Sequence, residues 1–136
     1  MKDENCIFCK LANGDIPTTT LYEDENFRVI LDASPAAKGH ALILTKEHYR
    51  NLYELEDELA KGVMPLAKKI INKLTPILNC DGYNIVQNNE EAAGQTVFHF
   101  HTHLIPRKKD DKVGVTWKMG TLKDEDVQDI LANLSK

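Results

Sequence analysis

The sequence lacks any apolar run that approaches the length of a membrane span, and residues 1–5 are too polar to open a secretory signal. A spanning helix needs about 20 consecutive apolar residues, and a signal peptide needs an apolar stretch of its own. Basic residues are also in the minority, with 17 Lys and Arg against 21 Asp and Glu and a net charge of −4. These shortages predict a cytoplasmic protein that binds neither a membrane nor nucleic acid.

Cysteine is scarce as well. The three cysteines, Cys6, Cys9 and Cys80, are an odd number, and only the first two are close in sequence. A small domain held together by disulfides has paired cysteines at higher density. The Cys6-x-x-Cys9 spacing instead indicates a metal or redox motif in a reducing compartment.

The chain does have enough residues, 136, and enough apolar side chains, 42%, for one domain with a real core. Apolar residues at spacings of three and four predict a long helix over residues 52–74, kinked or broken near Pro65 and ended by Pro76 and the turn after it. Short helices are expected at residues 6–12, with Asn5 as the N-cap, and from about Lys123 to Leu134. Strands are expected at residues 21–23, 27–31, 40–45, 83–87 and 97–106. This order indicates an α+β fold with an antiparallel sheet of about five strands.

Three of the five histidines, His99, His101 and His103, occupy alternate positions of the last predicted strand. Alternate residues of a strand share a face, so the three imidazoles are predicted to point the same way. Neighbouring ones would lie roughly 6.6 Å apart and the outer two about 13 Å apart, whereas a metal needs nitrogens within about 2.1 Å. Three ligands to one ion would require a bent strand, so we expect the histidines to divide their work.

The stretch His99-Phe100-His101-Thr102-His103-Leu104-Ile105 resembles the motif of the histidine-triad (HIT) family, in which histidines alternate with apolar residues; Thr102 departs from it. The likeness extends along the chain through Cys6-x-x-Cys9, Tyr22-Glu23-Asp24-Glu25, Leu31-Asp32, Lys38-Gly39-His40, Lys46-Glu47-His48, Asn88, Gly94-Gln95-Thr96 and Pro106-Arg107. The sequence is similar to bacterial members of the nucleotide-binding branch. This resemblance implies a single HIT domain over residues 1–136, a homodimer, and hydrolysis of purine nucleoside 5'-phosphoramidates, in which adenosine monophosphate is joined to an amine.

The resemblance also implies roles for the histidines. A neutral imidazole attacks phosphorus directly and forms a nucleotidyl-histidine that water hydrolyses, and His101 is expected to be this nucleophile. Its other ring nitrogen would be held by a backbone carbonyl or by a histidine such as His40. His103 would line the α-phosphate, where it could stabilise charge or protonate the leaving amine.

Three groups of residues are expected to bind the nucleotide. Backbone amides of Gly94, Gln95 and Thr96 and the side chains of Asn88 and Thr96 would contact the phosphate, where charge develops in the reaction. Asp32, at the end of a strand, suits the ribose hydroxyls. The apolar side chains of Phe8, Phe27 and Ile30 are expected to flank the base.

A second constellation consists of Cys6, Cys9, His48 and His99. Two thiolates and two imidazoles suit a closed tetrahedral zinc site, and several bacterial relatives have one of this kind. We therefore expect structural Zn²⁺ and no organic cofactor. Zinc binding of roughly 10–16 kcal/mol is comparable with the whole stability of a domain, about 5–15 kcal/mol, so the ion would anchor the amino-terminal segment.

Three other functions fit parts of the pattern. Diadenosine polyphosphates or other nucleotides are alternative substrates for the same site. A metal-dependent hydrolase would use the alternating histidines as ligands, but their spacing and the lack of a carboxylate beside the strand weaken this reading. A non-catalytic sensor or scaffold that binds adenosine monophosphate would need no reaction at His101 and His103.

Overall fold

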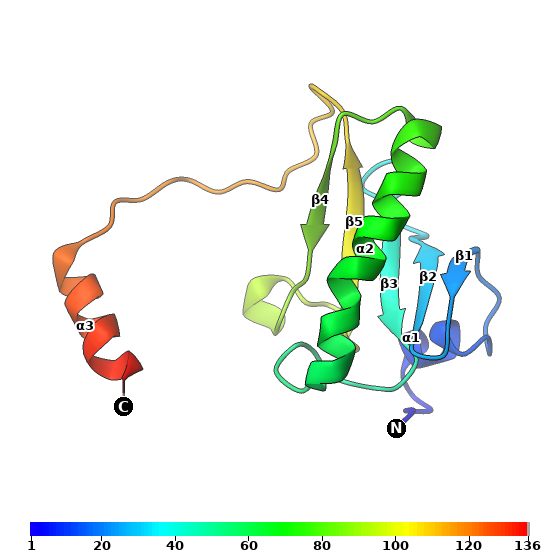
Figure 1. Cartoon of the computed structure of the whole chain (residues 1–136), viewed down its shortest axis with the longest axis horizontal. Coiled ribbons are helices and arrows are strands. Elements are labelled where there is room, and N and C mark those ends of the chain that lie inside the picture. Colours follow the sequence, from blue (N-terminus) through cyan, green and yellow to red (C-terminus); the bar gives the residue numbers. More distant parts are fainter. Residues whose placement is uncertain (136) are drawn as a thin grey trace.

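The computed structural model describes residues 1–135. Its elements follow the order α1 (Ile7–Ala12), β1 (Thr20–Glu23), β2 (Phe27–Leu31), β3 (Ala41–Thr45), α2 (Asp57–Leu78), β4 (Gly82–Val86), the 3₁₀ turn η1 (Glu91–Ala93), β5 (His101–Arg107) and α3 (Asp124–Leu134). The strands form one antiparallel sheet in the order β1-β2-β3-β5-β4 (Figure 1). The predicted α+β fold with a five-stranded sheet and one long helix is confirmed.

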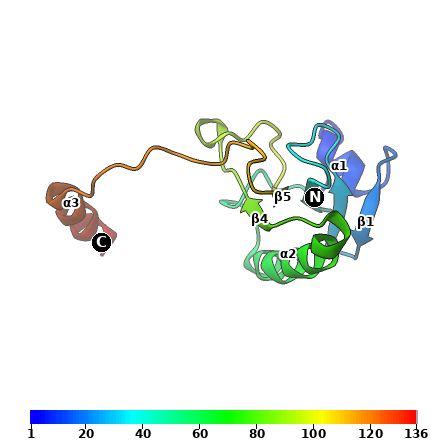
Figure 2. The ribbon, with the colours of Figure 1, turned by 90° about the horizontal axis from the view of Figure 1, so that it is seen from above.

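Different helices cover the two faces of the sheet. Figure 2 shows α2 along one face and α1 on the other. Under α2, the sheet and the helix form the larger apolar cluster, made by Phe27, Val29, Ala41, Ile43, Leu55, Val63, Leu66, Ala67, Ile70, Phe100 and Leu104. On the α1 side, a smaller cluster joins Ala12 to Ile30, Leu42 and Leu44. The second face therefore has less apolar cover and more room for polar side chains.

Helix α2 differs from its prediction at both ends. It begins at Asp57, so Leu52 and Leu55 of the apolar stripe lie before it, and the acidic first turn favours this start. It continues without a break through Pro65, and Pro76 lies inside its last turn rather than ending it. Asn79 ends the helix in the left-handed conformation, with φ 51°, a common way for a helix to stop.

Strand β5 begins at His101, four residues later than expected, because residues 97–99 form a bend. The bend separates His99 from the strand that carries His101 and His103. The three histidines therefore do not lie on one straight strand, and the bend sets the first of them, His99, apart from the other two. His40 similarly lies just before β3.

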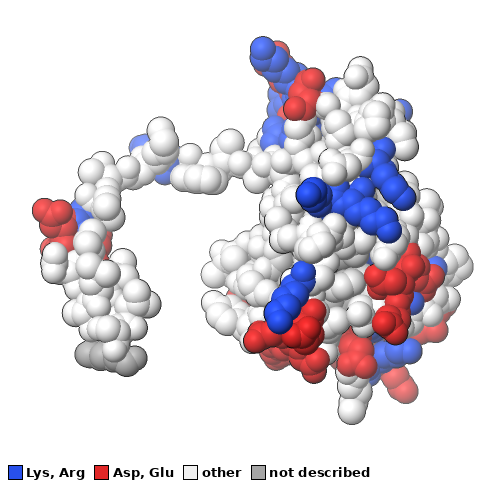
Figure 3. Space-filling view, viewed as in Figure 1, with Lys and Arg blue, Asp and Glu red and all other residues white. Residues whose placement is uncertain are grey.

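The chain after β5 leaves the sheet. Figures 1 and 2 both show α3 standing away from it at the end of an extended segment. This segment exposes Trp117 and Met119, with 83% and 86% of their surface accessible. Within residues 1–135, no helix is long and apolar enough to cross a membrane. On the face shown in Figure 3, basic groups are scattered among acidic and uncharged side chains rather than gathered in one stripe.

Candidate functional site

The site lies on the face of the sheet that α1 partly covers. In the sheet register His101 lies opposite Leu44 and His103 opposite Leu42, and paired residues of antiparallel strands point to the same side. Both leucines belong to the apolar cluster beneath α1. Strand alternation therefore brings the two imidazoles together, with ring centroids 5.0 Å apart.

The ring of His101 is held in a single orientation. Its Nδ1 lies 2.6 Å from the carbonyl oxygen of His99, which can only accept, so Nδ1 carries the proton and Nε2 keeps its lone pair. The ring of Phe8 packs against it in a T-shaped arrangement, with 4.8 Å between centroids. Burial lowers the pKa of His101, which favours the neutral imidazole that nucleophilic attack requires.

A chain of hydrogen bonds fixes the other two rings in the same way. The backbone N–H of Ala36 donates to Nδ1 of His40 at 2.9 Å, so the proton of neutral His40 is on Nε2. That nitrogen lies 2.9 Å from Nδ1 of His103 and donates to it, which leaves the proton of His103 on its own Nε2. Burial lowers the pKa of His40 and brings that of His103 to about 4.

Asp32 contacts this chain and the turn that follows it. One carboxylate oxygen lies 3.5 Å from Nε2 of His40, and the other accepts the backbone N–H of Ser34 at 2.8 Å. Asp32, His40 and His103 lie close enough to share a metal ion, but Nε2 of His40 carries a proton and is not a free ligand. The cluster of Asp32, His40 and His103 is therefore better suited to hold a proton than a metal ion.

The loop before β5 is braced by the side chain of Gln95, which is 2% exposed. Its amide nitrogen donates to the backbone oxygens of Arg50 and Val97, and its oxygen accepts from Asn51 and from the backbone N–H of Glu90. The side chain is fully used inside the protein. The sequence motif singled out Gln95 for its backbone and gave no sign of this bracing role.

Two of the three expected phosphate amides are already engaged. The N–H of Gly94 donates to the backbone oxygen of Glu91, and that of Gln95 donates to Glu90, so neither is free for a phosphate in this conformation. Thr96 is exposed and makes no hydrogen bond to any of residues 1–135. Asn88 lies beside Gly94, since a Cβ on that glycine would be 3.7 Å from Nδ2 of Asn88.

The residues expected at the base do not all reach this face. Phe8 lies against His101, and Ile30 belongs to the cluster beneath α1. Phe27 lies on the opposite face, in the core under α2, where a Cβ on Gly62 would be 3.1 Å from its ring. The structure therefore corrects the expectation for Phe27, which supports α2 rather than the site.

Cys6, Cys9, His48 and His99 come together beside the histidine site, with their ligand atoms within 4.8 Å of one another. Nδ1 of His99 lies 3.3 Å from the sulfur of Cys6 and 3.4 Å from that of Cys9, and Nδ1 of His48 lies 3.4 Å from the sulfur of Cys9. Zinc bonds of about 2.3 Å to sulfur and about 2.0 Å to nitrogen place tetrahedral ligand atoms about 3.5 Å apart. The donor set and its spacing fit a zinc ion.

Groups outside the cluster orient these ligands. Nε2 of His99 donates to the carbonyl oxygen of Thr45 at 2.7 Å, so its Nδ1 lone pair faces the sulfurs, as in most histidine metal ligands. The backbone N–H of Asp3 donates to the sulfur of Cys9 at 3.4 Å. Burial raises the pKa of the Cys9 thiol to about 11, so the ionised form at neutral pH depends on a nearby cation.

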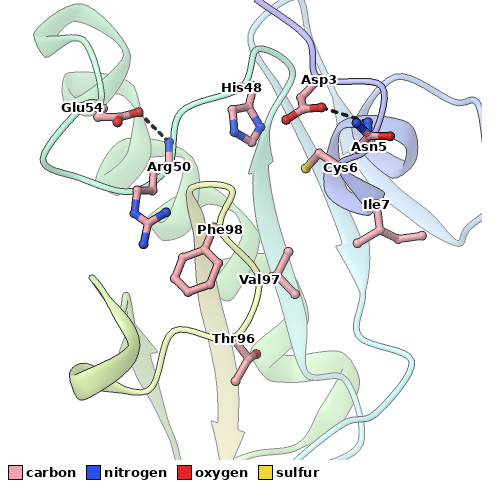
Figure 4. A pocket seen from close by; sticks show the side chains of 10 residues that line it. All are labelled: Asp3, Asn5, Cys6, Ile7, His48, Arg50, Glu54, Thr96, Val97 and Phe98. Carbon is pink, nitrogen blue, oxygen red and sulfur yellow. Dashed lines mark hydrogen bonds between the residues drawn. The ribbon is translucent and has the colours of Figure 1, made fainter.

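A cavity of about 660 Å³ opens beside this cluster. Figure 4 shows Cys6 and His48 at one end of it, next to Asp3 and Asn5, with Thr96, Val97 and Phe98 along the loop below. Cys9 and His99 are buried, with 3% and 0% of their surface accessible. Two of the four potential ligands therefore border the cavity, and two lie behind them.

Known proteins are similar to this chain in both sequence and fold. "Protein hit" of Bacillus subtilis is 46% identical over 98% of this chain and 94% of its own length. The adenosine 5'-monophosphoramidase hnt1 of Schizosaccharomyces pombe is 38% identical over 91% of each chain.

Two solved structures add to this. A Streptococcus mutans protein superimposes with a TM-score of 0.92 at 38% identity, covering 98% of this chain and 85% of its own. A zinc-bound histidine triad family protein of Mycobacterium smegmatis superimposes with a TM-score of 0.77 at 36% identity, covering 96% of each. The model of the HIT domain matches residues 13–110, which contain the three alternating histidines and His40. This chain belongs to the HIT family.

Proposed function

We propose that this protein hydrolyses purine nucleoside 5'-phosphoramidates, such as adenosine 5'-phosphoramidate, through a nucleotidyl intermediate on His101. The observation that carries the proposal is the bond from Nδ1 of His101 to the carbonyl oxygen of His99, because it leaves Nε2 as a nucleophile. Family membership supports hydrolysis of nucleotides in general, and the name of the S. pombe relative supports this class of substrate.

The first step forms a bond between Nε2 of His101 and the α-phosphorus and breaks the bond from phosphorus to the amine. The leaving amine takes the proton from Nε2 of His103, which the chain from Ala36 through His40 places there. Because its pKa is about 4, His103 is neutral before the reaction, so it gives this proton after taking up another from solvent and is neutral again afterwards; the charged ring is a strong acid toward the amine. Asp32 favours the positive charge that develops on these rings, since it lies 3.5 Å from His40.

The second step returns the site to its starting state. Water attacks the phosphorus, the bond to His101 breaks, and the nucleoside monophosphate leaves. His103 accepts a proton from this water and passes it to solvent, so that one water is consumed for each amine and monophosphate released. The same ring therefore acts first as an acid and then as a base.

The remaining contacts hold the nucleotide. Thr96, with its free amide and hydroxyl, and Asn88 would bind phosphate oxygens. Asp32 would accept from the ribose hydroxyls, and Phe8 and Ile30 would contact the base. Binding that used Gly94 or Gln95 amides would first have to open the turn in which they are engaged.

The metal cluster and a dimer complete the proposal. Cys6, Cys9, His48 and His99 would hold a structural Zn²⁺, and the solved zinc-bound relative supports this ion. An apolar groove between α2 and the edge strand β4, lined by Leu52, Met64 and Ile85 among others, would form the two-fold interface of a homodimer. Light scattering at micromolar concentration would give twice the mass of one chain.

The test is release of adenosine monophosphate from adenosine 5'-phosphoramidate by the wild type and by His101→Ala, with Cys80→Ser as a matched control. Binding of adenosine monophosphate is measured for all three. The proposal expects turnover by the wild type and the control, and binding without turnover by His101→Ala. Binding without turnover by the wild type would instead support a nucleotide sensor, and absence of binding would overturn both readings.

A further inference from the structure

His99 belongs to two sites at once. Its ring lies among the sulfurs of the metal cluster, and its Nε2 is bonded to the carbonyl oxygen of Thr45. Its own carbonyl oxygen holds Nδ1 of His101 at 2.6 Å. Residues 97–99 form a bend rather than a strand, and the peptide that carries this carbonyl is held by a backbone bond from the N–H of Phe100 to the oxygen of Tyr49 at 2.7 Å. Tyr49 follows His48, another member of the cluster, so the His99 ring and the segment that carries His48 together place the acceptor for His101.

The cysteines act on His101 by a second route. Phe8 lies between Cys6 and Cys9 in α1 and packs against the His101 ring. Helix α1 has only six residues, too few to be stable alone. The sulfur of Cys6 caps it by accepting the backbone N–H of Cys9. An ion bound to both sulfurs would therefore fix Phe8 and the wall that it forms beside His101.

The cluster also borders a cavity. Cys6 and His48 border the cavity of about 660 Å³, where the carboxylate of Asp3 also lies (Figure 4). Cys9 and His99 are reached only behind them. An ion that reached the cluster from the cavity would meet Cys6 and His48 before Cys9 and His99.

We propose that the Cys6–Cys9–His48–His99 cluster positions the reacting imidazole, and that exchange of its metal through the adjoining cavity switches His101 between a fixed and a loosened orientation. Two links carry the effect, the carbonyl oxygen of His99 and the ring of Phe8. The consequence for turnover rests on the proposed phosphoramidase function, whereas the consequence for the His101 ring does not. Supply of zinc would thereby regulate the enzyme.

The test compares zinc-loaded wild type, chelator-treated wild type, His48→Ala and Cys80→Ser. His48→Ala removes a ligand that touches His99 but contacts neither His101 nor Phe8, and Cys80 lies outside the cluster. Nitrogen-15 spectra of the imidazole rings report which nitrogen of His101 carries its proton. Absorption of bound Co²⁺ confirms whether each variant holds metal, and circular dichroism confirms that it is folded.

Loaded wild type and Cys80→Ser are expected to show one His101 species with its proton on Nδ1. Chelated wild type and His48→Ala are expected to show exchange between ring nitrogens, with kcat about tenfold lower and KM nearly unchanged. Addition of zinc would restore the wild type but not His48→Ala. Identical His101 spectra with and without metal would overturn the proposal. Absence of turnover by loaded wild type would instead overturn the proposed function, and the spectra would still decide the positioning.

Discussion

The two faces of the sheet do different work. Under α2, apolar side chains from β2, β3 and β5 meet the helix in one continuous cluster, and contacts there depend on shape alone. On the α1 face, each buried imidazole has a named partner for at least one ring nitrogen. Neighbouring residues of one strand, such as His103 and Leu104, therefore lie on opposite faces of the sheet. The α2 face stabilises the protein, and the α1 face determines which ring nitrogens of the histidines carry a proton.

The strongest test of this division is His103→Ala. The change removes the proposed proton donor to the leaving amine but opens only a partly exposed position. We expect kcat to fall about 10²–10⁴-fold, the usual worth of a general acid, while the free energy of unfolding changes little. Steady-state kinetics and urea unfolding measure the two effects. A large loss of stability with unaltered kcat would contradict the division between the faces.

Leu104→Ala is the matched change on the other face. Leu104 is fully buried under α2, and truncation there leaves a cavity that costs about 2–5 kcal/mol of unfolding free energy. Because the side chain points away from the histidines, kcat per folded molecule should stay within about twofold of the wild type well below the melting temperature. Denaturant unfolding and active-site titration with nucleotide separate stability from chemistry. Loss of kcat in fully folded protein would show that the faces are coupled.

The stability of the protein should depend on pH through the buried histidines of the α1 face. Burial brings the pKa of His103 from 6.5 to about 4, so between these values the unfolded chain binds a proton that the folded protein does not. Stability is therefore full above pH 6.5 and is lost as the pH falls toward about 4. The thermal midpoint should fall across this window, and His103→Gln should reduce the slope. A slope unaffected by His103→Gln would show that His103 is not the group that resists protonation.

The smallest effect is expected where the apolar face contains a misplaced polar group. The hydroxyl of Thr102 is buried and has no partner among residues 1–135. Thr102→Val keeps the shape and removes the unpaired hydroxyl, so it should stabilise the protein by about 1 kcal/mol. Differential scanning calorimetry measures the change. Destabilisation would mean that the hydroxyl finds a partner in the assembled protein, in the groove that Thr102 lines.

Much of this arrangement was predictable from the sequence. The alternation of His101 and His103 set their common face, and the Cys6-x-x-Cys9 pair with His48 and His99 indicated a shared cluster. The alternation of strand residues between two faces also argues against placing both Phe27 and Ile30 at the base. Phe27 and Ile30 are three residues apart in one strand, so they point to opposite faces, and only one of them could join the histidines.

The rest depends on loop geometry and on contacts between distant segments, neither of which the residue pattern shows. The amide of Ala36 reaches His40 only because the loop between β2 and β3 folds back on itself. Gln95 braces its loop through partners more than forty residues away. The intact helix across Pro65 is another case, since packing of α2 on the sheet compensates for the lost hydrogen bond.

The most direct test of the account is to trap the intermediate. Zinc-loaded wild type is mixed with adenosine 5'-phosphoramidate, quenched rapidly in denaturant at alkaline pH and analysed by mass spectrometry of its peptides. We expect one adenylyl group on the peptide that contains His101, attached at that residue, and none in His101→Ala. Release of adenosine monophosphate without any adenylylated histidine, or with the adenylyl group on another residue, would contradict it.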